Sequence, residues 1–180
     1  MRTRVIAAAG LAVGAALSVT VVRPSFAEPT ASTMQAAFRA RVVGVYDGDT
    51  LLVRRFGQSR WQSIRLHGVD APEYDPPNVQ RYGYSAFAFV YNETMGQDVI
   101  VQPVTRDFYG RAVSEIVLSD NRLLQEKVLE AGEGWVYRYY IWEPRRTQWL
   151  QKEATARQQR AGLWADQNPT PPWVWRDFVY

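Results

Sequence analysis

The stretch Arg65-Leu66-His67-Gly68-Val69-Asp70-Ala71-Pro72-Glu73 joins an apolar strand pattern to an acidic turn. Apolar residues flank Arg65, so its guanidinium must reach either solvent or an anion. A proline then interrupts the strand pattern, and Asp70 and Glu73 place two carboxylates within four residues. The stretch therefore predicts a strand that ends in a charged turn.

Two further strand patterns precede this stretch. Residues 38–46 are rich in valine and aromatic residues and end at Asp47-Gly48, a strong two-residue hairpin signal. Residues 50–56 are the predicted partner of that strand, and residues 61–69 alternate as a third strand. Together they predict a three-stranded meander.

The rest of the chain alternates between helix and strand patterns. Its predicted elements are a loop at 74–80, a helix at 82–95, strands at 99–105 and 112–118, a helix at 122–131, an extended aromatic segment at 135–142, a helix at 144–160 and a surface-packed segment at 173–175. Five strands with a helix after the third match an OB-fold. The prediction is an α+β fold with a five-stranded antiparallel OB-fold barrel and three α-helices.

The N-terminus has the pattern of a secretory signal peptide. Arg2 and Arg4 precede an uncharged run at residues 5–22, and small residues before Ala27 suit a signal peptidase. We expect cleavage near Ala27 and a periplasmic or secreted protein; the alternative is an uncleaved N-terminal membrane anchor. The expected domains are a signal peptide at 1–27, a linker at 28–36, an OB-fold domain at 37–165 and a C-terminal tail at 166–180.

Composition excludes several kinds of chemistry. The chain has no cysteine and one histidine, so it has no disulfide, no cysteine nucleophile and no multi-histidine zinc site. Removal of residues 1–27 would leave 18 basic and 18 acidic side chains, so the basic pI is no evidence for nucleic-acid affinity. Sixteen of those 18 cations are arginine, which favours bidentate contacts with phosphate or carboxylate.

Three charged motifs fall at the ends of predicted neighbouring strands. Asp47-Gly48-Asp49-Thr50 precedes the central stretch, and Asp107-Phe108-Tyr109-Gly110-Arg111 follows it with a second guanidinium. Each motif alone is compatible with an ordinary turn. In combination, oxygen ligands attract a hard cation and paired arginines attract a phosphate, which indicates a metal-assisted phosphodiester-cleaving site. His67 is the obvious candidate base, but we interpret it as a packed or hydrogen-bonded residue beside the site.

These motifs, with Ala156-Arg157 and Gly162-Leu163-Trp164, resemble the thermonuclease, or staphylococcal nuclease-like, family. The likeness covers residues 38–164. It implies an OB-fold barrel with three helices and Ca²⁺-dependent hydrolysis of DNA or RNA that leaves 3′-phosphate ends. The DNA or RNA preference stays open.

The resemblance also implies roles for individual residues. Asp49, Asp70 and the backbone carbonyl of Ala71 would ligate Ca²⁺, and Glu73 would position or deprotonate the attacking water. The remaining implied contacts are phosphoryl binding by Arg65 and Arg111, and substrate binding by Tyr109 and by Arg81, the only cation of the short loop at 74–83.

Two alternatives compete with this enzyme hypothesis. One is a non-catalytic OB-fold module that binds nucleic acid without cutting it. The other is an interaction domain anchored through the N-terminal run and docking through residues 173–180. We otherwise expect a monomer with no protein partner and no stable membrane association after signal cleavage.

Overall fold

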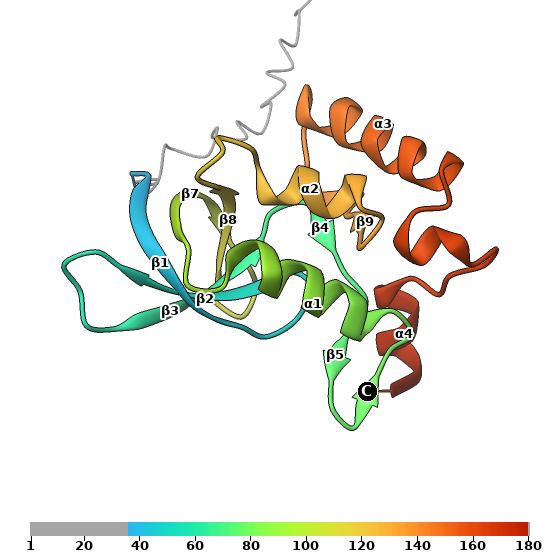
Figure 1. Ribbon diagram of the computed structural model, residues 1–180, viewed down its shortest axis with the longest axis horizontal. Helices are drawn as coiled ribbons and strands as arrows, with labels where there is room; N and C mark the ends of the chain where they lie inside the picture. The colour runs from blue at the N-terminus through green and yellow to red at the C-terminus, as the bar shows by residue number, and fades with distance from the viewer. Residues whose placement is uncertain (1–35, 180) are drawn as a thin grey trace, which may run out of the picture. The chain divides into compact units, whose positions relative to one another are not determined.

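The computed structural model describes residues 36–179, so the predicted signal peptide lies outside the described residues. Five strands close into a barrel (Figure 1) in the order β1-β2-β3-β8-β7. The barrel strands are β1 (Phe38–Val45), β2 (Thr50–Arg55), β3 (Trp61–Leu66), β7 (Asp98–Arg106) and β8 (Ala112–Val117). The predicted OB-fold barrel is confirmed.

The pairing of β3 with β8 departs from the expected antiparallel pattern. Every other neighbouring pair in the barrel is antiparallel, whereas β3 and β8 run parallel with Arg65 opposite Val113. Parallel neighbours need a long crossover, and the chain supplies one through α1 (Gly83–Thr94) and β7. This register places the end of β3 beside the start of β8, where two of the charged motifs lie.

Short elements surround the barrel and differ locally from expectation. The segment at 74–80 was expected to be a loop but forms a small hairpin, β5 (Tyr74–Asp75) and β6 (Asn78–Val79), with Pro76 and Pro77 at its turn. The prolines lie in the turn, where no backbone N–H is needed for hydrogen bonds between the strands, so they do not prevent pairing. The segment at 135–142 is extended only over β9 (Trp135–Val136), which pairs with β4 (Val69–Asp70) before the 3₁₀ turn η1 (Arg138–Tyr140).

Four α-helices lie in the described part of the chain, one more than expected. They are α1, α2 (Leu124–Glu130), α3 (Arg145–Gln158) and α4 (Pro172–Val179), with the 3₁₀ turn η2 (Gly162–Ala165) between the last two. The extra helix, α4, forms where the sequence predicted only a surface-packed segment. No helix in the described residues is long and apolar enough to cross a membrane.

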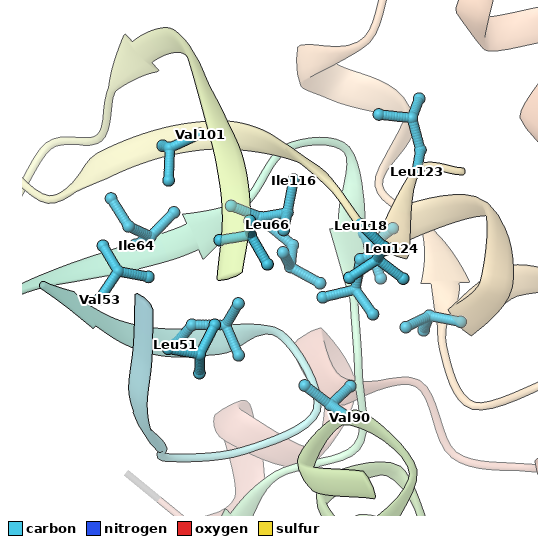
Figure 2. Packing of buried hydrophobic residues seen from close by; sticks show 14 of the residues in the cluster. Leu51, Val53, Ile64, Leu66, Val90, Val101, Ile116, Leu118, Leu123 and Leu124 are labelled. Carbon is cyan, nitrogen blue, oxygen red and sulfur yellow. The ribbon is translucent and has the colours of Figure 1, made fainter. Parts of the chain in front are cut away.

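The hydrophobic core fills the barrel and extends beneath the helices (Figure 2). Strand β1 alternates buried Phe38, Ala40 and Val42 with exposed arginines, the period of a strand with one face in the core. Val90 of α1 joins the barrel residues in this cluster, and Trp149 of α3 is completely buried. Each fully buried large side chain of this kind contributes about 1.5–3 kcal/mol. The core therefore fixes the barrel strands, at whose ends the charged motifs lie.

Candidate active site

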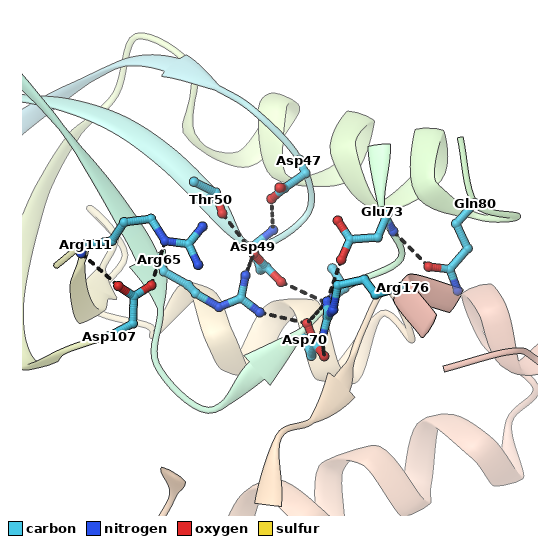
Figure 3. A network of polar contacts seen from close by, with 11 residues as sticks. Asp47, Asp49, Thr50, Arg65, Asp70, Glu73, Gln80, Asp107, Arg111 and Arg176 are labelled. Carbon is cyan, nitrogen blue, oxygen red and sulfur yellow. Dashed lines mark hydrogen bonds and ion pairs between the residues drawn. The ribbon is translucent and has the colours of Figure 1, made fainter. Parts of the chain in front are cut away.

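Arg65 connects the two acidic turns at one end of the barrel (Figure 3). Its Nη1 donates to Asp49 Oδ1 at 2.8 Å, and its Nη2 donates to Asp70 Oδ1 at 2.7 Å. Strand pairing explains why Arg65 reaches Asp49. Thr50, the residue after Asp49, begins β2 and lies opposite Arg65 near the end of β3. The structure thus brings together residues that are 21 positions apart in the chain.

Asp49 is held from several directions. Its carboxylate accepts hydrogen bonds from the Thr50 hydroxyl at 2.9 Å and the Ala71 backbone N–H at 3.1 Å, besides the bond from Arg65. Gly48 permits the contact, since a Cβ there would lie 2.6 Å from the Ala71 Cβ. The Asp49 N–H donates in turn to Asp47 Oδ1 at 2.9 Å. This network gives the Asp49 carboxylate a single preorganised position.

Asp70 lies between two guanidinium groups. Besides Arg65, Arg176 of α4 donates to both Asp70 oxygens, at 3.1 Å from Nη1 and 2.9 Å from Nη2. Arg176 Nη1 also donates to Glu73 Oε1, so one side chain joins both carboxylates of the central stretch. Sequence reasoning missed Arg176, because it lies 106 residues from Asp70 and in no charged motif. Its only sequence signal was an arginine within the aromatic C-terminal segment.

Burial changes the proton affinity of this carboxylate group. Burial, reinforced by the neighbouring Asp49 charge, raises the pKa of Asp47 to about 8. Burial likewise raises the pKa values of Asp70 and Glu73, although hydrogen bonds from Arg176 oppose the increase at both. The pKa of Arg65 is raised chiefly by the charge of Asp49, so this guanidinium stays protonated. The raised pKa values mean that negative charge is costly at these buried carboxylates, which therefore depend on nearby cations to stay ionised.

Arg111 lies beside this network at the start of β8. Its Nε donates to Asp107 Oδ2 at 2.6 Å, and its backbone N–H donates to Asp107 Oδ1 at 2.8 Å. Figure 3 shows the outer end of its guanidinium directed towards Arg65. Since Asp107 holds only Nε, the two terminal nitrogens form a fork without a hydrogen-bond partner among the described side chains. A fork of this shape suits bidentate contact with a phosphate.

The other predicted substrate contacts lie outside the network. Tyr109 is 81% exposed in the turn between β7 and β8, and its ring centroid is 5.7 Å from the Arg111 guanidinium carbon. Arg81 forms an ion pair with Asp166 at 2.6 Å and contacts none of the site carboxylates. The structure therefore brings Tyr109 close to a site arginine but does not bring Arg81 to the carboxylates.

His67 belongs to a different group of contacts. It is buried, its Nδ1 lies 3.4 Å from Glu115 Oε1, and its ring centroid is 6.0 Å from that of Trp149. Arg145 holds the same Glu115 carboxylate at 2.7 Å. The imidazole is thus packed between a core tryptophan and a structural ion pair, in keeping with its interpretation as a packed residue.

The donor set fits a hard divalent cation. Asp47, Asp49, Asp70 and Glu73 offer only carboxylate oxygens, the ligands that Ca²⁺ prefers. Within residues 36–179 no three ligand side chains converge closely enough to hold a metal ion in this conformation. The arginines account for this, because their guanidinium groups lie between the carboxylates as cations. The site therefore attracts positive charge, and a metal ion must compete with a guanidinium for it.

The carboxylates and arginine forks at one end of this small barrel are groups that phosphodiester hydrolases use. Residues 63–166 match the family described as "Staphylococcal nuclease homologue". The chain is 38% identical over 141 residues to an "Uncharacterized endonuclease" of Escherichia coli O157:H7, covering 78% of this chain and 86% of the relative. It is 34% identical over 175 residues to a "Micrococcal nuclease" of Shigella flexneri, covering 92% of this chain and 90% of the relative. The chain belongs to the staphylococcal nuclease family.

The chain also resembles part of a longer plant protein. The "Staphylococcal-like nuclease CAN1" of Arabidopsis thaliana is 34% identical over 131 residues, which cover 73% of this chain and 36% of the relative. The matched family region ends at residue 166, so α4 and Arg176 lie beyond it. The carboxylates and the two predicted site arginines all fall either within the family region or in the turn just before β2.

Proposed function

We propose that this nuclease is a calcium-dependent endonuclease that hydrolyses phosphodiester bonds of DNA or RNA and leaves 3′-phosphate ends. The observation that carries the proposal is the position of Arg65, which joins Asp49 and Asp70 by hydrogen bonds of 2.8 and 2.7 Å beside the Arg111 fork. A pure binding module has no need for buried carboxylates next to two arginines. The arrangement is suited to a phosphate that gains negative charge during reaction.

In this proposal Asp49, Asp70 and the Ala71 carbonyl hold Ca²⁺. When bound, the ion supplies positive charge that offsets the charge on a phosphoryl oxygen. Ala71 adjoins Asp49 through its N–H bond to that carboxylate, and its carbonyl is assigned to the ion as part of this proposal. Asp70 must turn at least one oxygen away from Arg176 to take part.

The two arginines bind the phosphoryl oxygens. Arg65 uses two of its five N–H donors on Asp49 and Asp70, so three remain for a phosphate. Arg111 is aimed by Asp107 and contributes its terminal fork. Both groups are positioned before substrate arrives, so they can act on the transition state without reorganising. Tyr109 lies close enough to Arg111 to contact the same phosphate group.

Glu73 serves as the group that holds or deprotonates the attacking water. Burial raises its pKa, which brings a carboxylate closer to the range in which a general base works well. Its backbone is fixed by Gln80, whose Oε1 accepts from the Glu73 N–H at 3.0 Å. Its side chain is bonded to Arg176, so that bond must open before Glu73 can take a proton.

The test uses the full chain with single-stranded DNA, duplex DNA and RNA, each with and without Ca²⁺. We expect shortened products only with Ca²⁺, and products that accept a 3′ label only after phosphatase treatment. Retarded but intact nucleic acid would favour the non-catalytic binding module. Products labelled without phosphatase treatment would contradict the proposed 3′-phosphate ends.

We further propose that the protein is exported after cleavage near Ala27 and acts as a monomer. The basic start, uncharged run and small residues before Ala27 support the export part of this proposal. An extracellular or periplasmic compartment also supplies Ca²⁺ at levels that suit a weak oxygen-ligand site. N-terminal sequencing of the protein from its native host tests it, and recovery of residue 1 in a membrane fraction would favour the anchor alternative.

A further inference from the structure

Arg176 occupies two carboxylates that the proposed function needs, Asp70 for its cation and Glu73 for its attacking water. Its guanidinium bonds both oxygens of Asp70, at 3.1 and 2.9 Å, and one oxygen of Glu73. Asp70 is fully buried, so its negative charge needs cationic partners, and Arg65 at 2.7 Å shares that role with Arg176. A cation bound to Asp70 would therefore compete with Arg176 for the same oxygens.

The other attachments of the helix that carries Arg176 are mainly apolar and aromatic, and they include buried Pro172 and a ring contact between Trp173 and Tyr137 at 6.4 Å between centroids. Trp173 packs edge-on against Trp135 at 6.2 Å between ring centroids, and Gln80 Nε2 donates to the Thr170 carbonyl at 2.6 Å just before the helix. Phe178 is 80% exposed, and α4 has only eight residues. A helix of that length has little stability of its own in water. Its docked position is therefore supported by the contacts of Arg176 together with these packing contacts.

The Trp173 contact also explains why α4 points Arg176 at the site. Trp135 is paired with Asp70 across β4 and β9, so the tryptophan that anchors α4 adjoins the carboxylate that Arg176 binds. Trp173 and Arg176 are three positions apart and share one face of the helix. Docking of the helix on Trp135 therefore also brings the guanidinium to the carboxylates.

We propose that Arg176 is a positioning residue that holds Asp70 and Glu73 in place until a divalent cation displaces it, and that its competition sets the cation affinity of the site. The inference rests on the proposed function. By thermodynamic linkage, if cation binding weakens the docking of α4, then docking of α4 lowers the cation affinity by the same factor. Couplings of this kind change affinity by about 5–150-fold. Removal of Arg176 should therefore tighten cation binding by a factor in that range.

The first experiment measures Ca²⁺ binding to the full chain by calorimetry, without substrate. We expect Arg176→Gln to bind Ca²⁺ about 5–150-fold more tightly than the native protein. Arg176→Lys keeps the charge but loses the fork over both Asp70 oxygens, so its affinity should fall between the two. Arg60→Gln is the control, since Arg60 lies exposed in the turn between β2 and β3, away from α4. Its affinity should equal that of the native protein.

The second experiment follows hydrogen exchange of residues 172–179 in the native protein, which avoids any folding defect of a variant. Added Ca²⁺ should speed exchange in α4 if the cation displaces Arg176. Unchanged exchange at saturating Ca²⁺ would overturn the proposal, because α4 would then be a fixed part of the site.

The results separate this inference from the function on which it rests. Equal Ca²⁺ affinities of the native protein and Arg176→Gln, together with Ca²⁺-dependent cleavage by both, would overturn the role of Arg176 and leave the nuclease proposal standing. Absence of Ca²⁺ binding in all four proteins would overturn both.

Discussion

Arg65 and Asp70 form a hydrogen bond of 2.7 Å that ties the end of β3 to the short strand β4. The Asp70 carboxylate is fully buried, whereas the Arg65 side chain is 20% exposed to solvent. Arg65 therefore has two separable duties: it neutralises buried carboxylates, and it presents its remaining donors outwards. Substitutions at Arg65 and Arg111 distinguish these duties, because Arg111 contacts no buried carboxylate of the network.

Arg65→Ala should lower both activity and stability. Loss of one preorganised donor lowers the cleavage rate on the order of 10²–10³-fold. Asp49 and Asp70 also lose a cation, which costs roughly 3–5 kcal/mol of unfolding free energy. Single-turnover rates and urea unfolding measure the two effects. Full activity in this variant would remove Arg65 from the mechanism.

Arg111→Ala should lower activity to a similar degree but leave the protein nearly as stable as before. Its side chain is 38% exposed and its ion-pair partner is Asp107, so the free energy of unfolding should change by less than about 1 kcal/mol. Asp107→Asn is the matched variant, since it keeps the guanidinium but weakens its orientation. We expect it to show a smaller rate loss. A larger loss in Asp107→Asn than in Arg111→Ala would argue against the orienting role of Asp107.

Chelation of Ca²⁺ should stop cleavage without unfolding the protein. The arginines already neutralise much of the charge on the carboxylates, so the fold does not depend on a metal ion for that purpose. Addition of excess EGTA should abolish product formation, and added Ca²⁺ should restore it. Circular dichroism in EGTA should remain that of the folded protein. Undiminished turnover in EGTA would mean that the carboxylates serve another purpose.

Glu133 should make the protein less stable as the pH rises. Its side chain is buried, Oε1 accepts from the Ser85 hydroxyl at 2.9 Å, and Oε2 has no hydrogen-bond partner among the described residues. Burial raises its pKa above the ordinary value of 4.5. The folded state then binds more protons than the unfolded state, so stability is present at low pH and is lost as pH rises through the folded pKa.

Glu133→Gln removes the charge while keeping the shape. We expect this variant to be more stable than the native protein at pH 8 and to lose much of that advantage at pH 4. Urea midpoints at the two pH values give the comparison. An equal difference at both pH values would show that Glu133 does not titrate in this way.

The sequence was sufficient for elements whose signals are local. The alternation in β1 and the Asp47-Gly48 turn predict the first hairpin, and the end of the observed strand differs by one residue. The two acidic turns and Arg65 were predicted as one site because strand order places them together. These features depend on side-chain period and turn chemistry, which a short window of sequence contains.

The missed features depend on contacts between distant segments. The parallel pairing of β3 with β8 follows from the path of the crossover, which residue alternation does not specify. Helix α4 was missed because eight residues have little helix stability of their own and need tertiary contacts, which include those with Trp135, Tyr137 and Asp70. Arg176 could not be assigned to Asp70, since no periodicity links residues 106 positions apart.

Gly48→Ala tests whether the two acidic turns must touch. A Cβ at Gly48 would lie 2.6 Å from the Ala71 Cβ and 2.7 Å from the Ala86 Cβ of α1, so the turn must move away from both. Overpacking of this kind costs about 1–3 kcal/mol. The movement should also lengthen the 3.1 Å bond from the Ala71 N–H to Asp49, and so lower cleavage along with stability. The control is Gly44→Ala, whose Cβ would meet only the side chain of Leu52, at 3.1 Å, and should leave cleavage nearly unchanged. Native cleavage and stability in Gly48→Ala would show that the site tolerates separation of its acidic turns, and that the Ala71 contact is not what positions Asp49.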